Sequence, residues 1–270
     1  MQFWMNYYRM NKDLANLKVL VTRPAHQAEP LCEAIAALGG LPVRLPLLAI
    51  EPLTPDARLR TQIQQLDNFN ILIFISTNAA VFGAALIDQY WPQFPVGIEV
   101  LAIGPTTAST LNEQLDCAAQ TSANGMDSEA VLELDVLNKV DGKRIGIFRG
   151  QGGRELLADT LRGRGAQVDY LEVYRRSPVK HDAQEFARLI NTDGVDLITV
   201  TSSESLRLIE QLAGDNTARL SLIPLLVPSA RIAEQASAAG FSTVLDAGGA
   251  NQASMIAALQ NYAAGADNKA

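Results

Sequence analysis

The chain has 270 residues, of which 48% are hydrophobic and 19% charged, and its formal net charge is −7. This length favours two domains, and the composition excludes intrinsic disorder and collagen-like or low-complexity assemblies. The excess of acidic over basic residues argues against a protein that binds nucleic acid by broad phosphate neutralisation. We therefore expect a globular protein without a nucleic-acid partner.

The longest apolar runs, such as Ile71–Ile75, have the length of a strand and fall far short of the roughly 18 residues that a membrane-spanning helix needs. The first residues lack the pattern of an export signal, and residues 1–16 are expected to form a mobile extension. Cys32 and Cys117 stand at no metal-binding or redox spacing, which is typical of buried thiols in a reducing compartment. These features predict a cytoplasmic protein without a membrane span or disulfide.

Short β-rich runs alternate with amphipathic helical patterns along nearly the whole chain, which is typical of parallel sheets with crossover helices. The runs are almost continuously apolar, so both faces of each strand should be buried. The predicted strands are Lys18–Thr22, Ile71–Ser76, Val100–Ile103, Arg144–Phe148, Leu197–Thr201, Leu225–Val227 and Thr243–Leu245.

An internal repeat organises these elements. Residues 18–52 align without gaps with residues 144–178, and Arg23 thereby matches Arg149. Two further pairs of segments have similar spacing, and they begin at Ile71 and Leu197 and at Leu101 and Leu225. The chain is therefore interpreted as a duplication of one α/β unit, which predicts two similar parallel-sheet domains of flavodoxin-like type.

The second strand of each copy alternates between apolar and polar residues and has prolines or charges nearby, so we expect an exposed connector rather than a central strand. The two connectors, residues 43–53 and 168–178, would pair as a two-stranded bridge. The first domain would then combine residues 17–42 and 179–264, and the second would span residues 54–167.

Standard catalytic signatures are absent from the sequence. It contains no phosphate loop of the form Gly-x-x-x-x-Gly-Lys-Ser/Thr, no His-Glu-x-x-His and no Gly-x-Ser-x-Gly. The glycine-rich segment 150–153 follows a predicted strand but lacks the full dinucleotide-binding spacing. This argues against the familiar NTPases, zincins and hydrolases, and we expect neither a cofactor nor a metal.

Each predicted strand is instead followed by small or polar residues that suit helix caps and leave backbone N–H groups open. In parallel sheets ligands bind at these strand ends, where helix N-termini attract anions. Two such domains facing each other would form a cleft for an anionic small molecule. As the alternative, the Ser and Thr residues of the loops only cap helices. The arginines and glycines expected at this site are Arg23, Arg149, Gly150, Gly152, Arg154 and Arg231.

Six segments carry a family resemblance through their order and spacing. They are VLVTRP (19–24), IFISTNAAV (73–81), LAIGPTTA (101–108), the long segment 142–178, LITVTSSES (197–205) and LLVPSARIAEQA (225–236). From Lys18 to about Tyr262 the sequence resembles the uroporphyrinogen-III synthase family. This resemblance implies two α/β domains joined by a two-stranded antiparallel connector, in a monomeric lyase that needs no cofactor.

The resemblance also implies the reaction. Linear hydroxymethylbilane, a polycarboxylate, would lose water and close to uroporphyrinogen III with inversion of its D ring, a step of tetrapyrrole biosynthesis. Loss of the hydroxyl would give an azafulvene cation, and attack at the substituted carbon would give a spiro-pyrrolenine that rearranges. Because the bilane cyclises unaided to the wrong isomer, the enzyme would mainly position a reactive substrate.

By position, the resemblance places the family tyrosine that helps the hydroxyl leave on Tyr174, for which packing on the connector is the alternative role. The substrate-binding hydroxyls that it implies are Ser76, Thr77, Thr107, Thr201, Ser202 and Ser229. The sequence departs from some relatives at Pro105, where they have Asn, and at Arg231, where they have a hydroxyl.

A second hypothesis assumes the same fold but no catalytic activity. In this reading the chain is a non-catalytic two-domain sensor that binds a tetrapyrrole-like or other anionic small molecule. Tight porphyrin binding without turnover would favour the sensor, whereas formation of the type III product would favour the lyase.

Overall fold

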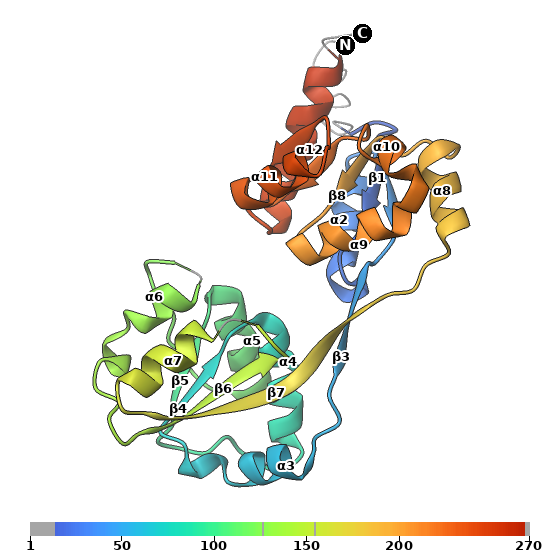
Figure 1. The fold of residues 1–270 in the computed structure, drawn as a ribbon. Helices are drawn as coiled ribbons and strands as arrows, with labels where there is room; N and C mark the ends of the chain where they lie inside the picture. The colour runs from blue at the N-terminus through green and yellow to red at the C-terminus, as the bar shows by residue number, and fades with distance from the viewer. Residues whose placement is uncertain (1–13, 126, 154, 268–270) are drawn as a thin grey trace, which may run out of the picture. The chain divides into compact units, whose positions relative to one another are not determined.

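The computed structural model describes residues 14–125, 127–153 and 155–267 of the chain, and Figure 1 shows its fold as a ribbon. Strands and helices alternate along the chain, as the sequence predicts. Among the described residues, none of the helices combines the length and the hydrophobicity of a membrane span.

Two compact units divide the chain. The first consists of the residues up to Ala49 and those from Ser177 onward, and the second is the continuous segment Ile50–Arg176. Each unit contains one five-stranded sheet with a hydrophobic core on either face. The predicted fold class, two similar α/β domains, is confirmed.

The first unit has the strand order β10-β9-β8-β1-β2, and all of its neighbouring strands run parallel. Leu20 points to a core covered by α8 to α11, whereas Val19 and Val21 point to a core covered by α2 and α12. The strands are β1 (Lys18–Val21), β2 (Leu41–Arg44), β8 (Leu197–Thr199), β9 (Leu225–Val227) and β10 (Val244–Asp246). The helices are α2 (Ala25–Ala37), α8 (Ala183–Asn191), α9 (Ser203–Ala213), α10 (Thr217–Leu220), α11 (Ala230–Ala238) and α12 (Gln252–Asp267), with a 3-10 turn at Gly214–Asn216.

The second unit has the strand order β3-β7-β6-β4-β5. Helices α3, α4 and α5 contribute to the core on one face of its sheet, and α6 and α7 contribute to the core on the other. The strands are β3 (Leu48–Pro52), β4 (Ile71–Phe74), β5 (Glu99–Ala102), β6 (Arg144–Gly150) and β7 (Gln167–Pro178). The helices are α3 (Ala57–Gln64), α4 (Thr77–Asp88), α5 (Pro105–Leu115), α6 (Ser128–Leu132) and α7 (Leu156–Gly163), with 3-10 turns at Leu66–Asn68 and Asp135–Leu137.

The strand orders bear out the duplication. The adjacent strands β2-β1-β8-β9 of the first unit correspond to β7-β6-β4-β5 of the second, in the same order. In the first unit β10 follows, pairing Val244 with Leu225. The second unit has only an isolated bridge in the matching place, between Leu101 and Gln120, at the same separation along the chain. One sheet edge of the second unit is therefore a reduced version of that in the first.

We expected residues 43–53 to form one connector strand, and this is wrong for the first part of the segment. Val43 and Arg44 belong to β2, which pairs in parallel with β1 inside the first unit. Pro46 follows and has no N–H group, but on either side of it the Leu45 and Leu47 N–H groups still donate to the Val21 and Thr22 carbonyls, at 2.9 and 3.1 Å. The next strand, β3, begins at Leu48.

The second expected connector, residues 168–178, is part of the sheet of the second unit. Its β7 is an internal strand between β3 and β6, and it runs parallel to β6. The alternation in this strand arises because Leu171 is fully buried on one face, whereas Tyr170 is only partly covered on the face of α7. A half-covered internal strand therefore has the same sequence pattern as an exposed connector.

The end of β7 pairs with β3 in an antiparallel arrangement. The Leu53 N–H donates to the Val173 carbonyl, and the Val179 N–H donates to the Leu47 carbonyl, both at 3.0 Å. Residue numbers rise along β3 while those of its partners in β7 fall, so the two strands are antiparallel. This two-stranded antiparallel link between the units is the one that the family resemblance implies.

The expected extension, residues 1–16, lies outside the described residues as far as residue 13. Leu14 is fully buried in the core between the β1 sheet and helices α2 and α12, and its N–H donates to the Leu38 carbonyl at 3.1 Å. The first unit therefore already includes Leu14, which corrects the expected domain start at residue 17.

Both cysteines are buried free thiols, as the sequence predicts. Burial raises the pKa of both thiols, that of Cys117 to about 11. Near neutral pH they are therefore protonated and pack as small apolar side chains.

The substitution Gly165→Ala should destabilise the second unit. Gly165 has a φ of +88°, and an added Cβ would overlap Oδ1 of Asp141. We expect a loss of about 1–2 kcal/mol in the free energy of unfolding, the usual cost of an L side chain in this conformation. The matched control is Gly163→Ala at the end of α7, where nothing lies within 4 Å and alanine favours the helix. Equal denaturation midpoints for the two variants would contradict this account.

Candidate active site

The end of β4 supplies the first polar group at the carboxyl edge of the second unit's sheet. Ser76 follows this strand with extended backbone and is the N-cap of α4, where its Oγ accepts a hydrogen bond from the Ala79 N–H at 3.1 Å. The same Oγ lies 3.2 Å from the Tyr174 hydroxyl oxygen. A residue that caps a helix thus also contacts the predicted catalytic tyrosine.

A β-bulge directs Tyr174 toward Ser76. The register of β6 and β7 shifts so that Arg149 pairs with Glu172 but Gly150 pairs with Tyr174, which leaves Val173 as the extra residue. Val173 and Tyr174 therefore pack in the same core, on the face of α4, although neighbouring residues of a regular strand point to opposite faces. Without the bulge, Tyr174 would point toward α7.

The Tyr174 side chain is held firmly in this position, because only 1% of the residue is exposed. Its ring lies so close to Gly150 that a Cβ on this glycine would be 2.5 Å from the ring carbon Cε2. On the helix side, the ring centroid lies 5.9 Å from that of Phe82 in α4. The Tyr174 carbonyl accepts a hydrogen bond from the Gln151 N–H at 2.8 Å.

A second pair of hydroxyls lies at the same sheet edge. The Oγ1 atoms of Thr77, in the first turn of α4, and Thr107, in the first turn of α5, are 3.5 Å apart. Thr107 is buried, and α5 begins after Gly104, whose φ of +84° favours glycine. The N-termini of two helices therefore meet here, and their free N–H groups and dipoles favour an anion.

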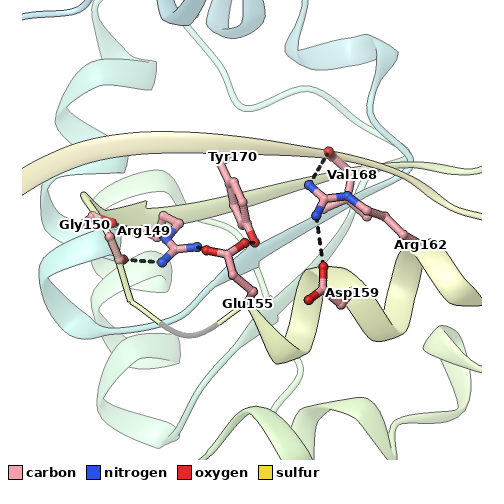
Figure 2. A network of polar contacts seen from close by, with 8 residues as sticks. Arg149, Gly150, Glu155, Asp159, Arg162, Val168 and Tyr170 are labelled. Carbon is pink, nitrogen blue, oxygen red and sulfur yellow. Dashed lines mark hydrogen bonds and ion pairs between the residues drawn. The ribbon is translucent and has the colours of Figure 1, made fainter.

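Arg149 lies at the same edge but on the opposite face of the sheet, with α7. Its guanidinium is almost completely buried, with 3% of the side chain exposed. The Nε donates to the Gly150 carbonyl at 3.2 Å, Nη1 to the Glu155 carboxylate at 3.3 Å, and Nη2 to the Gly152 carbonyl. Figure 2 shows this guanidinium between Gly150 and Glu155.

Tyr170 completes the polar network in Figure 2. The Arg149 guanidinium lies over its ring, 4.4 Å from the centroid, and its hydroxyl donates to Glu155. This hydrogen bond is the main cause that lowers the pKa of Glu155, while burial raises the pKa of Tyr170. The predicted site residue Arg154, which precedes Glu155 in the sequence, lies outside the described residues.

The first unit presents a similar series of helix caps. Ser202 is the N-cap of α9, and its Oγ accepts a hydrogen bond from the Ser205 N–H at 3.0 Å. Thr201, which precedes it, is half-buried at the end of β8. Ser229 is the N-cap of α11 with the same extended backbone, but its hydroxyl makes no capping hydrogen bond. Arg231, on the first turn of α11, is exposed, and its Nη1 donates to the Ser203 Oγ at 3.3 Å.

Arg23 follows β1 and is the counterpart of Arg149 in the repeat. It donates to the Ala250 carbonyl in the loop before α12, and burial lowers its pKa. Both duplicated arginines therefore donate to backbone carbonyls of loops in their own unit. The sequence places both arginines at a site for an anionic small molecule, and in the structure both guanidinium groups have partners within the protein.

The structure brings together some of the predicted residues and separates others. Ser76 meets Tyr174, Gly150 lies beneath the tyrosine ring, and Thr77 meets Thr107, whereas Arg149 lies on the other face of the sheet. Gly152 has a φ of +71° and presents its carbonyl to Arg149. Direct contact of these residues with a substrate stays a prediction.

Sequence reasoning missed the contact between Glu155 and Tyr170. The repeat contains a signal for it, because these two residues align with Glu29 and Arg44, which form an ion pair at 2.6 Å in the first unit. The same aligned positions thus connect α2 to β2 in the first unit and the start of α7 to β7 in the second. The described part of the chain has no group of three or more His, Cys, Asp or Glu side chains that could hold a metal ion.

Comparisons with known proteins agree with this architecture. Residues 29–257 match the family model of "Uroporphyrinogen-III synthase HemD". The uroporphyrinogen-III synthase of Escherichia coli (strain K12) is 32% identical over 249 residues, which cover 90% of this chain and 100% of that protein.

Two solved structures share the fold. A crystal structure of a mutant uroporphyrinogen III synthase from Thermus thermophilus has a TM-score of 0.58 at 18% identity, covering 91% of this chain and 98% of that one. The uroporphyrinogen-III synthetase of Helicobacter pylori has a TM-score of 0.56 at 14% identity, covering 89% and 96%. The extent of the family match and the identity to the Escherichia coli protein show that this chain belongs to the uroporphyrinogen-III synthase family.

Proposed function

We propose that this member of the family converts linear hydroxymethylbilane to uroporphyrinogen III, with Tyr174 assisting loss of the bilane hydroxyl. The reaction removes one water and closes the macrocycle with the D ring inverted, so the protein acts as a cyclising hydro-lyase. The position of the Tyr174 hydroxyl at the sheet edge is the observation that carries the proposal, since this oxygen lies 3.2 Å from Ser76 at the start of α4.

The hydrogen bonds around Tyr174 suit a donor to a leaving hydroxyl. Ser76 Oγ already accepts the Ala79 N–H, so its own proton is available to the Tyr174 oxygen. In the proposed arrangement Ser76 donates to Tyr174, and the phenolic proton then points to the substrate. As the bilane C–O bond breaks, the Tyr174 phenol donates its proton to the departing oxygen, which leaves as water. The proton that the substrate loses when the macrocycle closes then returns to the phenolate. The buried ring fixes this donor before the substrate arrives.

The carboxylates of the bilane require binding groups that do not depend on net positive charge, because the chain is acidic overall. The helix N-termini at the sheet edges provide them through free N–H groups and helix dipoles. We assign substrate carboxylates to the starts of α4 and α5, next to Thr77 and Thr107, and to the starts of α9 and α11 in the first unit. Positioning at these edges selects the type III ring closure over the spontaneous one.

Ser229 supports a binding role in the first unit. Its hydroxyl makes no capping hydrogen bond, so it is available to a ligand, whereas the Ser202 hydroxyl is engaged by the Ser205 N–H and Oγ. Thr201 lies beside Ser202, and Arg231 lies on the first turn of α11. We propose that Ser229 and Arg231 bind substrate directly and that Ser202 mainly organises its helix.

The first prediction concerns the product. Incubation of the protein with freshly prepared hydroxymethylbilane should give mainly the type III isomer, measured by oxidation to the porphyrin and chromatographic separation. A sample without protein should give type I, because the bilane cyclises unaided. Type I alone in both samples would overturn the proposed function, and tight porphyrin binding in that case would favour the sensor.

The substitution Tyr174→Phe tests the catalytic assignment. It removes the hydroxyl but keeps the ring against Gly150 and Phe82, so we expect kcat to fall about 10- to 100-fold, at or below the usual contribution of a general acid, with little change in KM. Tyr90→Phe is the matched control, because Tyr90 also packs against this core and lies outside the proposed site. Wild-type kcat in Tyr174→Phe would remove this residue from the mechanism.

The substitutions Ser202→Ala and Ser229→Ala should have opposite signatures. Ser202→Ala should lower the free energy of unfolding by about 1 kcal/mol through loss of a helix cap. Ser229→Ala loses no cap, so its stability should stay within about 0.5 kcal/mol of wild type, while its KM rises. Thermal or chemical denaturation and steady-state kinetics on both variants decide this. A stable Ser229→Ala with unchanged KM would contradict the assigned binding role.

A further inference from the structure

Residues 150–153 comprise the last residue of β6 and the start of the loop that follows it. This segment, called the loop 150–153 below, contacts Tyr174, but its glycines do little to restrict its backbone conformation. Three of its four residues are glycines, and Gly152 and Gly153 have φ values of +71° and +109°. Glycine gives a loop the largest choice of backbone conformations. The loop nevertheless contacts Tyr174 twice, through Gly150 under the ring and through the Gln151 N–H on the Tyr174 carbonyl.

Hydrogen bonds from Arg149 restrict the backbone conformation of these glycines. Its guanidinium donates to the carbonyls of Gly150 and Gly152, and so holds the loop at two points. It packs so closely that a Cβ on Gly153 would lie 2.9 Å from Nη2. Burying this cation carries a desolvation cost, which the two carbonyls, the Glu155 carboxylate and the Tyr170 ring offset.

We propose that Arg149 is a positioning residue for the reaction. By fixing the carbonyls of Gly150 and Gly152, it fixes the loop against which Tyr174 rests and thereby the distance from the Tyr174 hydroxyl to Ser76. This inference rests on the catalytic role proposed for Tyr174. It reassigns Arg149 from the substrate contact that the sequence pattern suggests to an action through the loop.

The geometry disfavours direct recognition of a carboxylate by Arg149. Its Nε, Nη1 and Nη2 atoms already donate to two carbonyls and one carboxylate within its own unit, so the guanidinium has partners without a substrate. It also lies on the α7 face of the sheet, whereas Tyr174 and Ser76 lie on the α4 face. The effect of Arg149 on the reaction must therefore pass through the backbone between them.

The test is a mutant cycle with Arg149→Met and Tyr174→Phe, alone and combined, in the full chain. Steady-state kinetics with hydroxymethylbilane should show that Arg149→Met lowers kcat roughly 10- to 100-fold, as expected for a misplaced catalytic group, while KM stays within about 2-fold. In the Tyr174→Phe background, the same substitution should lower kcat by less than about 2-fold, because the group that it positions is already gone.

Arg162→Met is the matched control. Arg162 also stacks on the Tyr170 ring, 5.4 Å from its centroid, but it donates to Asp159 and the Val168 carbonyl and not to the loop (Figure 2). We expect wild-type kcat and KM for this variant. If Arg149→Met does not fold, Arg149→Lys keeps the buried charge with fewer donors, and it should show the same fall in kcat to a smaller degree.

A second readout does not depend on turnover. With isotope-labelled tyrosine rings, the Tyr174 signal, assigned by its loss in Tyr174→Phe, should shift in folded Arg149→Met or Arg149→Lys and stay in place in Arg162→Met. An unchanged Tyr174 signal, a raised KM with unchanged kcat, or losses that multiply in the double variant would overturn the proposal. A shifted signal in a protein whose wild type forms no type III product would instead support the positioning while rejecting the proposed function.

Discussion

The parallel direction of the strands is the constraint on which the candidate site depends. In a parallel sheet every crossover helix starts at the same edge, so free N–H groups collect where the strands end. The caps Ser76, Ser202 and Ser229 all lie at such starts. An acidic chain can therefore hold a polyanion without a basic surface, because the attraction comes from oriented backbone groups. This explains why net charge is a poor guide to the ligand of this protein.

Duplication provides two copies of this edge, and the copies differ at the place where we propose the chemistry. The contact between Glu29 and Arg44 in the first unit corresponds to that between Glu155 and Tyr170 in the second. The counterpart of β2 in the second unit is the longer, twelve-residue strand β7, and its bulge precedes Tyr174. In the proposed function, the scaffold common to both copies binds the substrate, and the bulge in one copy places the hydroxyl of Tyr174.

The sequence predicts the strands, the duplication and the fold class because these depend on local patterns of apolar residues and on aligned segments. It does not predict the break at Pro46 or the pairing of Val43 in β2, since edge and internal strands can share one pattern. The bulge before Tyr174 is a matter of register between two strands far apart in the chain. The burial of Arg149 equally depends on glycine carbonyls that no residue pattern reveals.

The discontinuity of the first unit has a consequence for how the chain folds as it leaves the ribosome. Val19 in β1 pairs with Leu197 in β8, so the earliest strand waits for a partner that is synthesised only after the whole second unit. The continuous segment Ile50–Arg176 can complete its own core first. During that interval the apolar strand β1 and helix α2 lack the cover that β8, β9 and α12 later provide, so their apolar side chains are open to non-native contacts during synthesis.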